Sequence, residues 1–454
     1  ETAHEVYSVI RASQRDRFNA VVFLTGVPGA GKTLAGLNVV HGAVEAGLSP
    51  EGDIVYLSGN TPLVVVLREA LSLDQYARDK RRNARARLED ARRTTRATIQ
   101  HINDFLKEYV NRDAVVPSGH VIVFDEAQRA WNEKQGKEKF GREASEPYLV
   151  LEAMARHADW SVTVCLVGLG QEINDGEDGL QGWVRAVAAL NMSSSARWHV
   201  YAPSAICQAV AGPRSLGEPI PGVANHRIER LHLDVPMRAF RSPLLGEWIE
   251  AALDGRPEQG HALASQMNYP LVLTRDLPEA KKWLDHHTQG ERRKGLLASS
   301  GARRLRADGL GQVLNATDGQ TIAHWYLQPA GDIRSSHALE VPANEYTSQG
   351  LELDFACLCW GGDLIRRGGT FVVRRLGGNR WNEVRDPTGC EFVKNSYRVL
   401  LSRAREGLVV WVPRGDDGDH TRNRADLDAI ADYLVSCGLR PIESISSSNA
   451  AIPH

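Results

Sequence analysis

Short continuous runs of apolar residues alternate along the chain with longer stretches that read as helices. Runs such as Val121–Phe124, in which every position is apolar, are typical of strands covered on both faces, as in a parallel sheet flanked by helices. Strands and helices in alternation predict an α/β fold. Seven runs are expected to form strands: Val21–Leu24, Ile54–Leu57, Val121–Phe124, Val162–Val167, Gly295–Leu297, Phe355–Cys359 and Val409–Val412.

The strand-like runs fall into two groups. Between the groups, residues 191–229 carry proline and glycine, and we interpret this region as a connection rather than core. We therefore expect one domain at residues 1–230, a second at 231–415, and a C-terminal helix and tail at 416–454. No run of about 18 apolar residues occurs, so the sequence predicts no membrane span.

Composition and charge are ordinary for a globular protein, with 42% hydrophobic and 24% charged residues. The six cysteines form no CxxC pair, which argues against a zinc site or a disulfide framework and favours a reducing cytoplasm. The net charge of −2 gives no general attraction to nucleic acid, so such a partner must be held by a local surface. The chain opens at Glu1 with neither a Met nor a leader, from which we expect no signal peptide; we also expect a protein partner or a fused upstream domain.

Residues 26–33 read GVPGAGKT, an instance of the phosphate-loop pattern G-x-x-x-x-G-K-[ST]. They follow an apolar run and precede an amphipathic stretch, which is the strand–loop–helix context that the pattern requires. The glycines let backbone N–H groups surround phosphate oxygens, and the start of the helix adds the positive end of its dipole. We expect Lys32 to contact the β- and γ-phosphates and the Thr33 hydroxyl to bind Mg²⁺. The predicted nucleotide-binding residues here are Gly26, Pro28, Gly29, Ala30, Gly31, Lys32 and Thr33.

Two acids follow the apolar run that ends at Phe124. Asp125, at the strand tip, is expected to hold Mg²⁺ directly or through water. Glu126 is expected to orient and deprotonate the attacking water, because phosphoryl transfer needs little beyond positioning and charge neutralisation. Together with the phosphate loop, the acid pair predicts a nucleotide hydrolase without separating kinases, GTPases and helicases.

Other polar residues lie at further strand ends. Gln171 follows the run Val162–Val167, where its amide can sense a γ-phosphate. Arg238, with Arg241 close by, lies where the second domain begins, and Arg403 lies far along the chain in NSYRVLLSRAREG. Arginines that complete a nucleotide site from an opposite lobe can be worth ~10³–10⁵ in rate.

Together these motifs resemble a superfamily 1 helicase core and, more specifically, the Schlafen group 3-like DNA/RNA helicase domain family. The matching segments span about residues 20–412. The resemblance implies two RecA-like lobes, with ATP in the cleft between them. The residues that carry it are GVPGAGKT, LSGNTPL (57–63), VIVFDEAQRAW, CLVGLGQEINDGEDGLQGW, GLLASSGARRL (295–305), SSHALEVPANEYTSQGLELD (335–354) and YRVLLSRAREG.

The resemblance also assigns roles by position. Gln171 matches the phosphate sensor, and Arg238 and Arg403 match the second-lobe arginines that reach the γ-phosphate. Arg241 is an alternative to Arg238. The core site that the resemblance implies consists of Lys32, Thr33, Asp125 and Glu126.

Two further segments acquire roles from the resemblance alone. One resembles the loop that couples ATP to the nucleic-acid strand, with Glu352 extending toward the ribose. The other resembles the segment that touches the nucleic-acid backbone. The first comprises Gln349, Gly350 and Glu352, and the second comprises Ser58, Asn60 and Thr61.

Three features are open to either of two interpretations. Residues 78–96 hold nine Lys or Arg against three acids, and they form either a solvated surface or a local groove for nucleic acid. The glycine-rich segment Gly361–Arg375 either follows a phosphate backbone or is an exposed hairpin. Four tryptophans either stack on bases or, as is commoner, fill core: Trp131, Trp183, Trp325 and Trp360.

We therefore expect an ATP-dependent translocase or helicase that uses ATP and Mg²⁺ on single-stranded or duplex nucleic acid, with DNA favoured over RNA. The alternative is an ATPase switch that responds to a protein partner and does not unwind nucleic acid. ATPase activity that rises with nucleic acid separates the first function from the second.

Overall fold

Two units make up the chain, Glu1–Arg238 and Ala239–His454. The sequence prediction put the boundary between its first two domains after residue 230. The computed structural model describes residues 1–27, 29–48, 53–110, 115–168, 177, 179–193, 197–207, 215–235 and 244–442.

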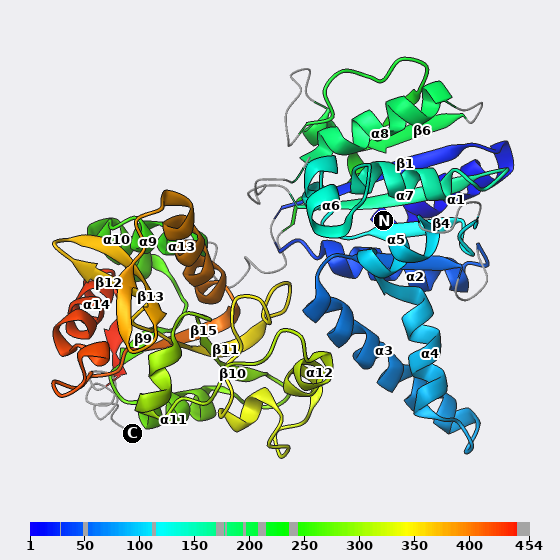
Figure 1. The fold of residues 1–454 in the computed structure, drawn as a ribbon. Helices are drawn as coiled ribbons and strands as arrows, with labels where there is room; N and C mark the ends of the chain where they lie inside the picture. Colours follow the sequence, from blue (N-terminus) through cyan, green and yellow to red (C-terminus); the bar gives the residue numbers. More distant parts are fainter. Residues whose placement is uncertain are drawn as a thin grey trace. The chain divides into compact units, whose positions relative to one another are not determined.

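The first unit is built on a parallel sheet in the order β3-β2-β4-β5-β1-β6-β7, with β8 paired to the end of β1 (Figure 1). Every residue of β1, β2, β4 and β5 is buried, which is why their sequences read as unbroken apolar runs. The strands are β1 (Asn19–Gly26), β2 (Ile54–Ser58), β3 (Ile99–His101), β4 (Val121–Phe124), β5 (Ser161–Gly168), β6 (Trp198–Ala202), β7 (Ala224–Arg227) and β8 (His232–Leu233).

Helices cover both faces of this sheet. Apolar residues of α1, α2 and α3 pack on one face, and those of α5, α7 and α8 pack on the other. Helices α3 and α4 extend beyond the body of the unit as a hairpin (Figure 1). The helices are α1 (Thr2–Asp16), α2 (Lys32–Glu45), α3 (Thr61–Arg82), α4 (Leu88–Thr98), α5 (Ile102–Tyr109), α6 (Glu133–Phe140), α7 (Glu146–Met154) and α8 (Gly179–Ser193).

The interpretation of residues 191–229 as a connection outside the core was wrong. This region supplies β6 and β7, and β6 pairs in parallel with β1. Its tryptophan, Trp198, is 2% exposed and belongs to the core. The strands are short and the flanking segments carry Pro and Gly, so the composition of the region concealed them.

The second unit contains a parallel sheet in the order β10-β11-β15-β9-β16. Three of its strands coincide with predicted runs, whereas β9 lies in an apolar run that the sequence prediction did not select. All seven predicted strands are thus present, and the predicted α/β fold with parallel sheets flanked by helices is confirmed. The strands are β9 (Leu271–Thr274), β10 (Lys294–Ala298), β11 (Leu353–Cys359), β15 (Ala404–Trp411) and β16 (Arg440–Pro441).

Helix α11 covers one face of the second sheet, while α9, α10, α13 and α14 pack against one another. A separate antiparallel sheet, β12-β13-β14, contacts α14 and α13. The segment expected to be a C-terminal helix and tail therefore supplies α14 and β16 to this unit. The bounds are α9 (Leu245–Leu253), α10 (Pro257–Gln266), α11 (Leu277–His287), α12 (Gly319–Leu327), α13 (Pro387–Leu401), α14 (Arg424–Ser436), β12 (Leu364–Arg367), β13 (Thr370–Gly377) and β14 (Arg380–Glu383).

Candidate functional site

The glycine-rich segment forms the connection between β1 and α2. Gly29 and Gly31 have φ values of 76° and 82°, a region that residues with a Cβ rarely adopt. Gly26 has a different reason to be glycine, because a Cβ there would lie 2.9 Å from both the Cβ and the carbonyl oxygen of Leu233 in β8. The tight path of the loop therefore depends on glycine at all three positions.

Lys32 is the first residue of α2, and its side chain turns back toward the loop. Its Nζ donates hydrogen bonds to the carbonyl oxygens of Gly26 and Val27, each at 3.1 Å. The first turn of any helix has N–H groups without carbonyl partners in the helix, and these groups favour an anion. An ammonium group and a helix N-terminus thus meet at one loop, as phosphate binding requires.

Asp125 follows β4 and is 3% exposed. Its Oδ1 accepts a hydrogen bond from the Glu126 N–H at 3.1 Å, whereas its Oδ2 has no hydrogen-bond partner among the described residues. Burial and the neighbouring Glu126 carboxylate raise the pKa of Asp125 to about 7, and the charge of Lys32 opposes this shift. A buried carboxylate oxygen with unused capacity fits an oxygen-preferring cation such as Mg²⁺.

The hydroxyl of Tyr56, in β2, lies beside this carboxylate. Tyr56 is fully buried, and its hydroxyl makes no hydrogen bond of standard geometry within the described residues, although it lies close enough to Asp125 and Thr33 for both side chains to influence its pKa. Burial is the main cause that raises the pKa of Tyr56, and the Asp125 charge adds to it, while Thr33 acts in the opposite direction. The predicted metal-binding residues Thr33 and Asp125 therefore converge on one buried hydroxyl, which the sequence prediction missed.

Glu126 adopts a left-handed conformation, with φ 54° and ψ 44°. Such a backbone costs about 1–3 kcal/mol in a residue with a side chain and is found most often at functional sites. Gln128, which is 2% exposed, donates from Nε2 to the Glu126 carboxylate. The Gln128 Oε1 accepts from the N–H of Gly168 at the end of β5, 3.1 Å away. The Gln128 amide thus fixes the predicted base relative to the neighbouring strand.

Sequence signals for Tyr56 and Gln128 exist but are weak. Tyr56 is the only hydroxyl within the apolar run Ile54–Leu57, and Gln128 follows the acid pair by two residues. Nothing in the sequence says which way either side chain points, so both required the structure.

In the second unit, the structure brings Arg403 to the predicted coupling loop. Its Nη1 donates to the carbonyl oxygens of Ser348 and Leu351, at 3.3 and 3.4 Å, on either side of Gln349 and Gly350. Gly350 has φ 73°, which lets the chain turn at this point. Two regions that the sequence linked only through the family resemblance are therefore in contact, and here Arg403 stabilises the loop.

Glu352, the last predicted residue of this loop, is partly exposed and faces the guanidinium of Arg405 at 4.0 Å. Arg405 also faces Asp354 at 3.7 Å. The Arg405 side chain is 56% exposed, so in this structure it is more accessible than the half-buried Arg403.

The predicted nucleic-acid contacts at the end of β2 make local hydrogen bonds. Ser58 is buried and its Oγ accepts from the Asn60 N–H, while the Asn60 Oδ1 accepts from Leu63 N–H as the N-cap of α3, both at 3.2 Å. Thr61, the first residue of α3, is exposed. Capping is a sufficient structural reason for Asn60, and Thr61 is the residue of the three whose side chain faces solvent.

Four predicted residues lie outside the described residues: Pro28, Gln171, Arg238 and Arg241. Their predicted roles stay predictions.

The glycine-rich hairpin predicted at Gly361–Arg375 corresponds to β12 and β13. Three of its four arginines make contacts inside the unit, and two of these, Arg367 and Arg374, form ion pairs with Asp426 of α14 at 2.8 Å. Arg366 lies over the ring of Tyr433, at 3.7 Å from its centroid. Contacts inside the unit therefore account for these three cations, and an exposed track for phosphates is the weaker interpretation.

Three of the four tryptophans are core residues, as the commoner interpretation held. Trp183, Trp325 and Trp360 are at most 1% exposed. Trp131 is partly exposed, and the ammonium of Lys139 lies 3.7 Å from its ring centroid.

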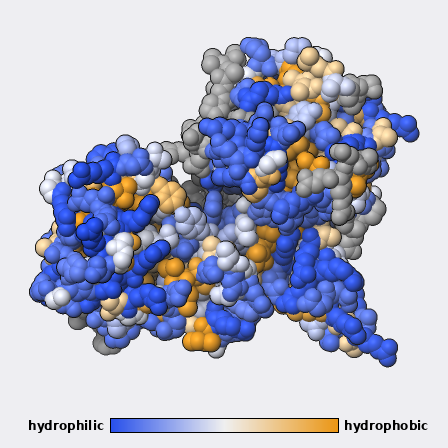
Figure 2. Space-filling model, in the orientation of Figure 1, coloured by the Kyte–Doolittle hydropathy of each residue, from blue (hydrophilic) through white to orange (hydrophobic). Residues whose placement is uncertain are grey.

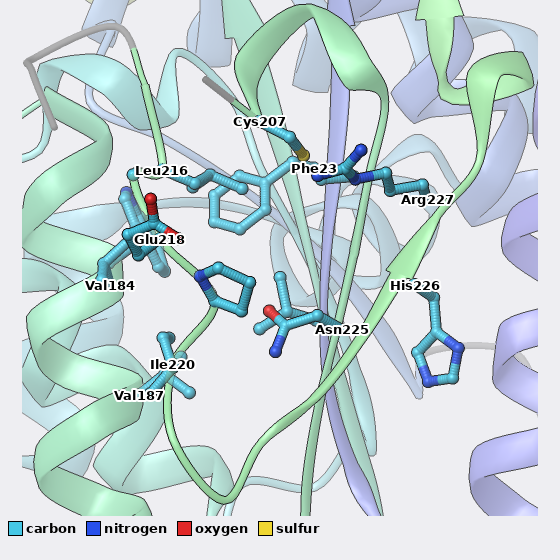
Figure 3. Close-up of a pocket in the computed structure, with 15 residues that line it drawn as sticks. Phe23, Val184, Val187, Cys207, Leu216, Glu218, Ile220, Asn225, His226 and Arg227 are labelled. Carbon is cyan, nitrogen blue, oxygen red and sulfur yellow. The ribbon is translucent and has the colours of Figure 1, made fainter. Parts of the chain in front are cut away.

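A cavity of about 160 Å³ lies elsewhere in the first unit, between α8, β6, β7 and the segment 216–220 (Figure 3). Phe23 forms part of its wall, and Cys207, Glu218 and Arg227 lie at its polar side. None of the phosphate-loop residues or the acid pair lines it, so this cavity is separate from the predicted nucleotide site.

No helix in the described part of the chain is both long and apolar enough to span a bilayer. Within the same residues, His, Cys, Asp and Glu side chains do not gather in groups of three or more that could hold a metal ion. A Mg²⁺ held by Thr33 and Asp125 would therefore depend on phosphate and water for its remaining ligands, as Mg²⁺ commonly does.

The first unit has three features of one class of α/β proteins: a parallel sheet with helices on both faces, a glycine-rich strand–loop–helix, and an acid pair at a strand end. This class includes helicase domains. Within that class, the chain belongs to the family described as Schlafen group 3, DNA/RNA helicase domain, whose model matches residues 19–414. The family match confirms the resemblance seen in the motifs and identifies this chain as a helicase-type domain.

Other comparisons add little. No curated protein matches the chain significantly. Among solved structures, the Hef helicase domain of Pyrococcus furiosus aligns with 11% identity over 90% of this chain and 95% of its own, at a TM-score of 0.28. A TM-score this low carries no argument about fold or function.

Proposed function

We propose that this chain hydrolyses ATP with Mg²⁺ and uses the reaction to move along, or to unwind, nucleic acid. The observation that carries the proposal is the buried Asp125 carboxylate, whose Oδ2 has no partner among the described residues, beside a phosphate-loop sequence. Lys32 acts electrostatically on the same carboxylate, so the groups suited to phosphate and to metal are neighbours. This pairing is what a Mg²⁺–nucleotide complex needs.

Each residue has a distinct role in the proposed reaction. Backbone N–H groups of the loop and the Lys32 ammonium bind the β- and γ-phosphates. Thr33 and Asp125 hold Mg²⁺, which when bound neutralises charge on the phosphates. Glu126 accepts a proton from the attacking water, and Gln128 holds the Glu126 carboxylate in position.

Other residues in the proposal act around this core. Gln171 senses the γ-phosphate, and two arginines contact it: Arg238, at the end of the first unit, and Arg403, in the second unit. Because Arg403 donates to Ser348 and Leu351 carbonyls, its engagement with nucleotide requires those bonds to rearrange. Coupling to nucleic acid through Gln349, Gly350 and Glu352 would follow from that rearrangement.

The proposed substrate is DNA in preference to RNA, and the proposal includes a cytoplasmic location and a further protein partner. Ser58, Asn60 and Thr61 are proposed to contact the nucleic-acid backbone. The helicase family supports a nucleic-acid partner in general.

The test is the steady-state ATPase rate without nucleic acid and with single-stranded DNA, duplex DNA or RNA, each at two salt concentrations. We expect one nucleic acid to stimulate the rate severalfold, and we expect the stimulation to weaken as salt rises. Lys32→Ala is the control for contaminating ATPases, because it removes the ammonium at the phosphate loop. A rate that stays low and flat with all nucleic acids contradicts a nucleic-acid motor and favours the partner-regulated switch.

A further inference from the structure

The hairpin formed by α3 and α4 carries a local surplus of positive charge. Residues 78–96 hold nine Lys or Arg and three acids, whereas the whole chain has a net charge of −2. The hairpin extends beyond the body of the unit, and its surface is hydrophilic (Figures 1 and 2). A local surplus of this size in a nearly neutral protein sets up an attractive field for a polyanion.

Most of these cations lack an acidic partner, although Lys80 and Arg81 donate hydrogen bonds to the backbone carbonyl oxygens of Ala84 and Ala77. Three of the nine pair with acids on the hairpin itself: Arg78 with Asp74, Arg92 with Glu69 and Glu89, and Arg93 with Asp90. The other six are exposed and form no ion pair within the described residues. They are Lys80, Arg81, Arg82, Arg85, Arg87 and Arg96.

The hairpin is held in shape where it joins the sheet. Arg92 of α4 makes a two-pronged contact with Glu69 of α3, at 2.7 and 3.0 Å. Arg68 donates to the carbonyl oxygen of Ile99 at 2.6 Å, which ties α3 to the start of β3. Helix α3 has 22 residues and is therefore roughly 33 Å long. The cations thus lie on a firm support, so little ordering is needed before they bind a partner.

The kinds of side chain on the hairpin indicate which polyanion it would bind. Between residues 61 and 98, Tyr76 is the only aromatic residue, so bases of a single strand would find no row of stacking platforms. The large apolar side chain that is exposed on the hairpin is Leu73, at 38%. One such side chain supplies neither the anchor residues of a protein interface nor the apolar face of a membrane-bound helix. Contacts to a duplex phosphate backbone require only Lys and Arg.

We propose that the α3–α4 hairpin binds the phosphate backbone of a nucleic-acid duplex through its six unpaired cations, independently of base sequence. A duplex carries one charge per ~1.7 Å of axis, a density that suits closely spaced arginines. The hairpin begins at Thr61, the last residue of the segment proposed to touch nucleic acid, and five of the six cations lie at or just beyond the far end of α3, so the bound duplex would extend away from that segment. This inference rests on the proposed function, because it names the form of nucleic acid that the motor engages.

The test compares binding of a fluorescent duplex DNA of mixed sequence to the full chain and to a triple variant, Arg81→Gln, Arg82→Gln and Arg85→Gln. The binding constant K is measured over a series of salt concentrations, and log K is plotted against log salt concentration. The slope should become shallower by about 2–3 in the variant, since each lost phosphate contact lowers the magnitude of the slope by ~0.9. Affinity at about 100 mM salt should fall at least tenfold. The substituted residues are exposed, so thermal stability and the ATPase rate without nucleic acid should not change.

A matched control removes three exposed cations from other helices of the same unit: Lys107→Gln, Lys134→Gln and Lys137→Gln. It makes the same change in net charge and should leave the affinity and the slope almost unaltered. An equal loss in this control would show that only net charge matters and would overturn the assignment to the hairpin.

Other outcomes separate the inference from the proposed function. If the full chain binds duplex and the triple variant binds it with the same affinity and slope, the hairpin is not the contact, although the motor function stands. If the triple variant loses single-stranded DNA while keeping duplex, or if polyglutamate or vesicles with anionic lipid compete better than duplex, the duplex assignment is wrong. If the full chain binds no nucleic acid and none stimulates its ATPase, the proposed function fails and this inference fails with it.

Discussion

Replacing Tyr56 with phenylalanine tests the candidate site through stability and activity together. The substitution keeps the buried ring and deletes a hydroxyl that has no partner among the described residues. A buried polar group without a hydrogen bond costs about 1–3 kcal/mol. Tyr56→Phe should therefore stabilise the nucleotide-free protein, by about 1 kcal/mol if part of that cost is relieved in solution.

The expected change in melting temperature follows from the size of the first unit, Glu1–Arg238. For a unit of this length, 1 kcal/mol corresponds to about 2–4 °C. Differential scanning calorimetry without Mg²⁺ or nucleotide should show a rise of this size. With Mg²⁺ and ATP the turnover number should change little, because a hydroxyl that makes no hydrogen bond does not hold Asp125 or Thr33 in position.

Tyr7→Phe is the matched control in the same unit. The Tyr7 hydroxyl donates to the carbonyl oxygen of Asn38 at 2.7 Å, so its removal should lower stability by about 0.5–1.5 kcal/mol. The two substitutions delete the same atom and should shift the melting temperature in opposite directions. If Tyr56→Phe lowers the melting temperature as much as Tyr7→Phe does, the Tyr56 hydroxyl is hydrogen-bonded to Asp125 in solution and the reasoning is wrong.

Three further substitutions test other parts of the molecule. Glu126→Gln should retain ATP binding and reduce turnover about 10²–10⁴-fold, measured by fluorescent-nucleotide titration and single-turnover hydrolysis; loss of binding would make Glu126 structural. Gly26→Ala should destabilise the first unit by about 1–3 kcal/mol in chemical denaturation, because its Cβ meets the β8 backbone, and an unchanged midpoint would contradict this packing. Hydrogen bonds from Thr421 and Arg422 lower the pKa of Asp419 in the folded protein. The ionised Asp419 therefore stabilises the folded state at pH values above about 4, the ordinary Asp range, and this contribution is lost as the pH falls below that range. Asp419→Asn should therefore melt lower at pH 7 and lose less stability on acidification; parallel pH profiles for the two proteins would refute this.

The strands that the sequence predicted are those that are buried on both faces. Val121–Phe124 is apolar at each position because helices cover both sides of the sheet, and its bounds match β4. In contrast, β7 alternates between half-buried and exposed positions at the sheet edge, so it lacks the apolar run. A search for continuous apolar runs therefore does not predict this edge strand.

The candidate site could be predicted only as far as its motifs extend. The phosphate-loop sequence and the acid pair name Lys32 and Asp125 without a structure, because each motif carries its own local context, a loop between strand and helix for Lys32 and a strand end for Asp125. Tyr56 comes from a third strand, and its proximity to Asp125 depends on the pairing of β2 with β4. Likewise, the contact of Arg403 with the loop at Gly350 depends on tertiary packing across about fifty residues of chain.

The order of strands in the second sheet has a consequence for how the protein is made. Strand β9 is the first of that sheet to leave the ribosome, yet both of its neighbours, β15 and β16, come from much later in the chain. At 5–20 residues per second, synthesis from β9 to β16 takes roughly 10–30 s. Until β15 has been made, both edges of Leu271–Thr274 lack their partner strands, and one edge still lacks its partner until β16 follows; unpaired edges invite pairing with other chains. Slower elongation should therefore increase aggregation of nascent chains and leave the refolding of finished protein unaffected.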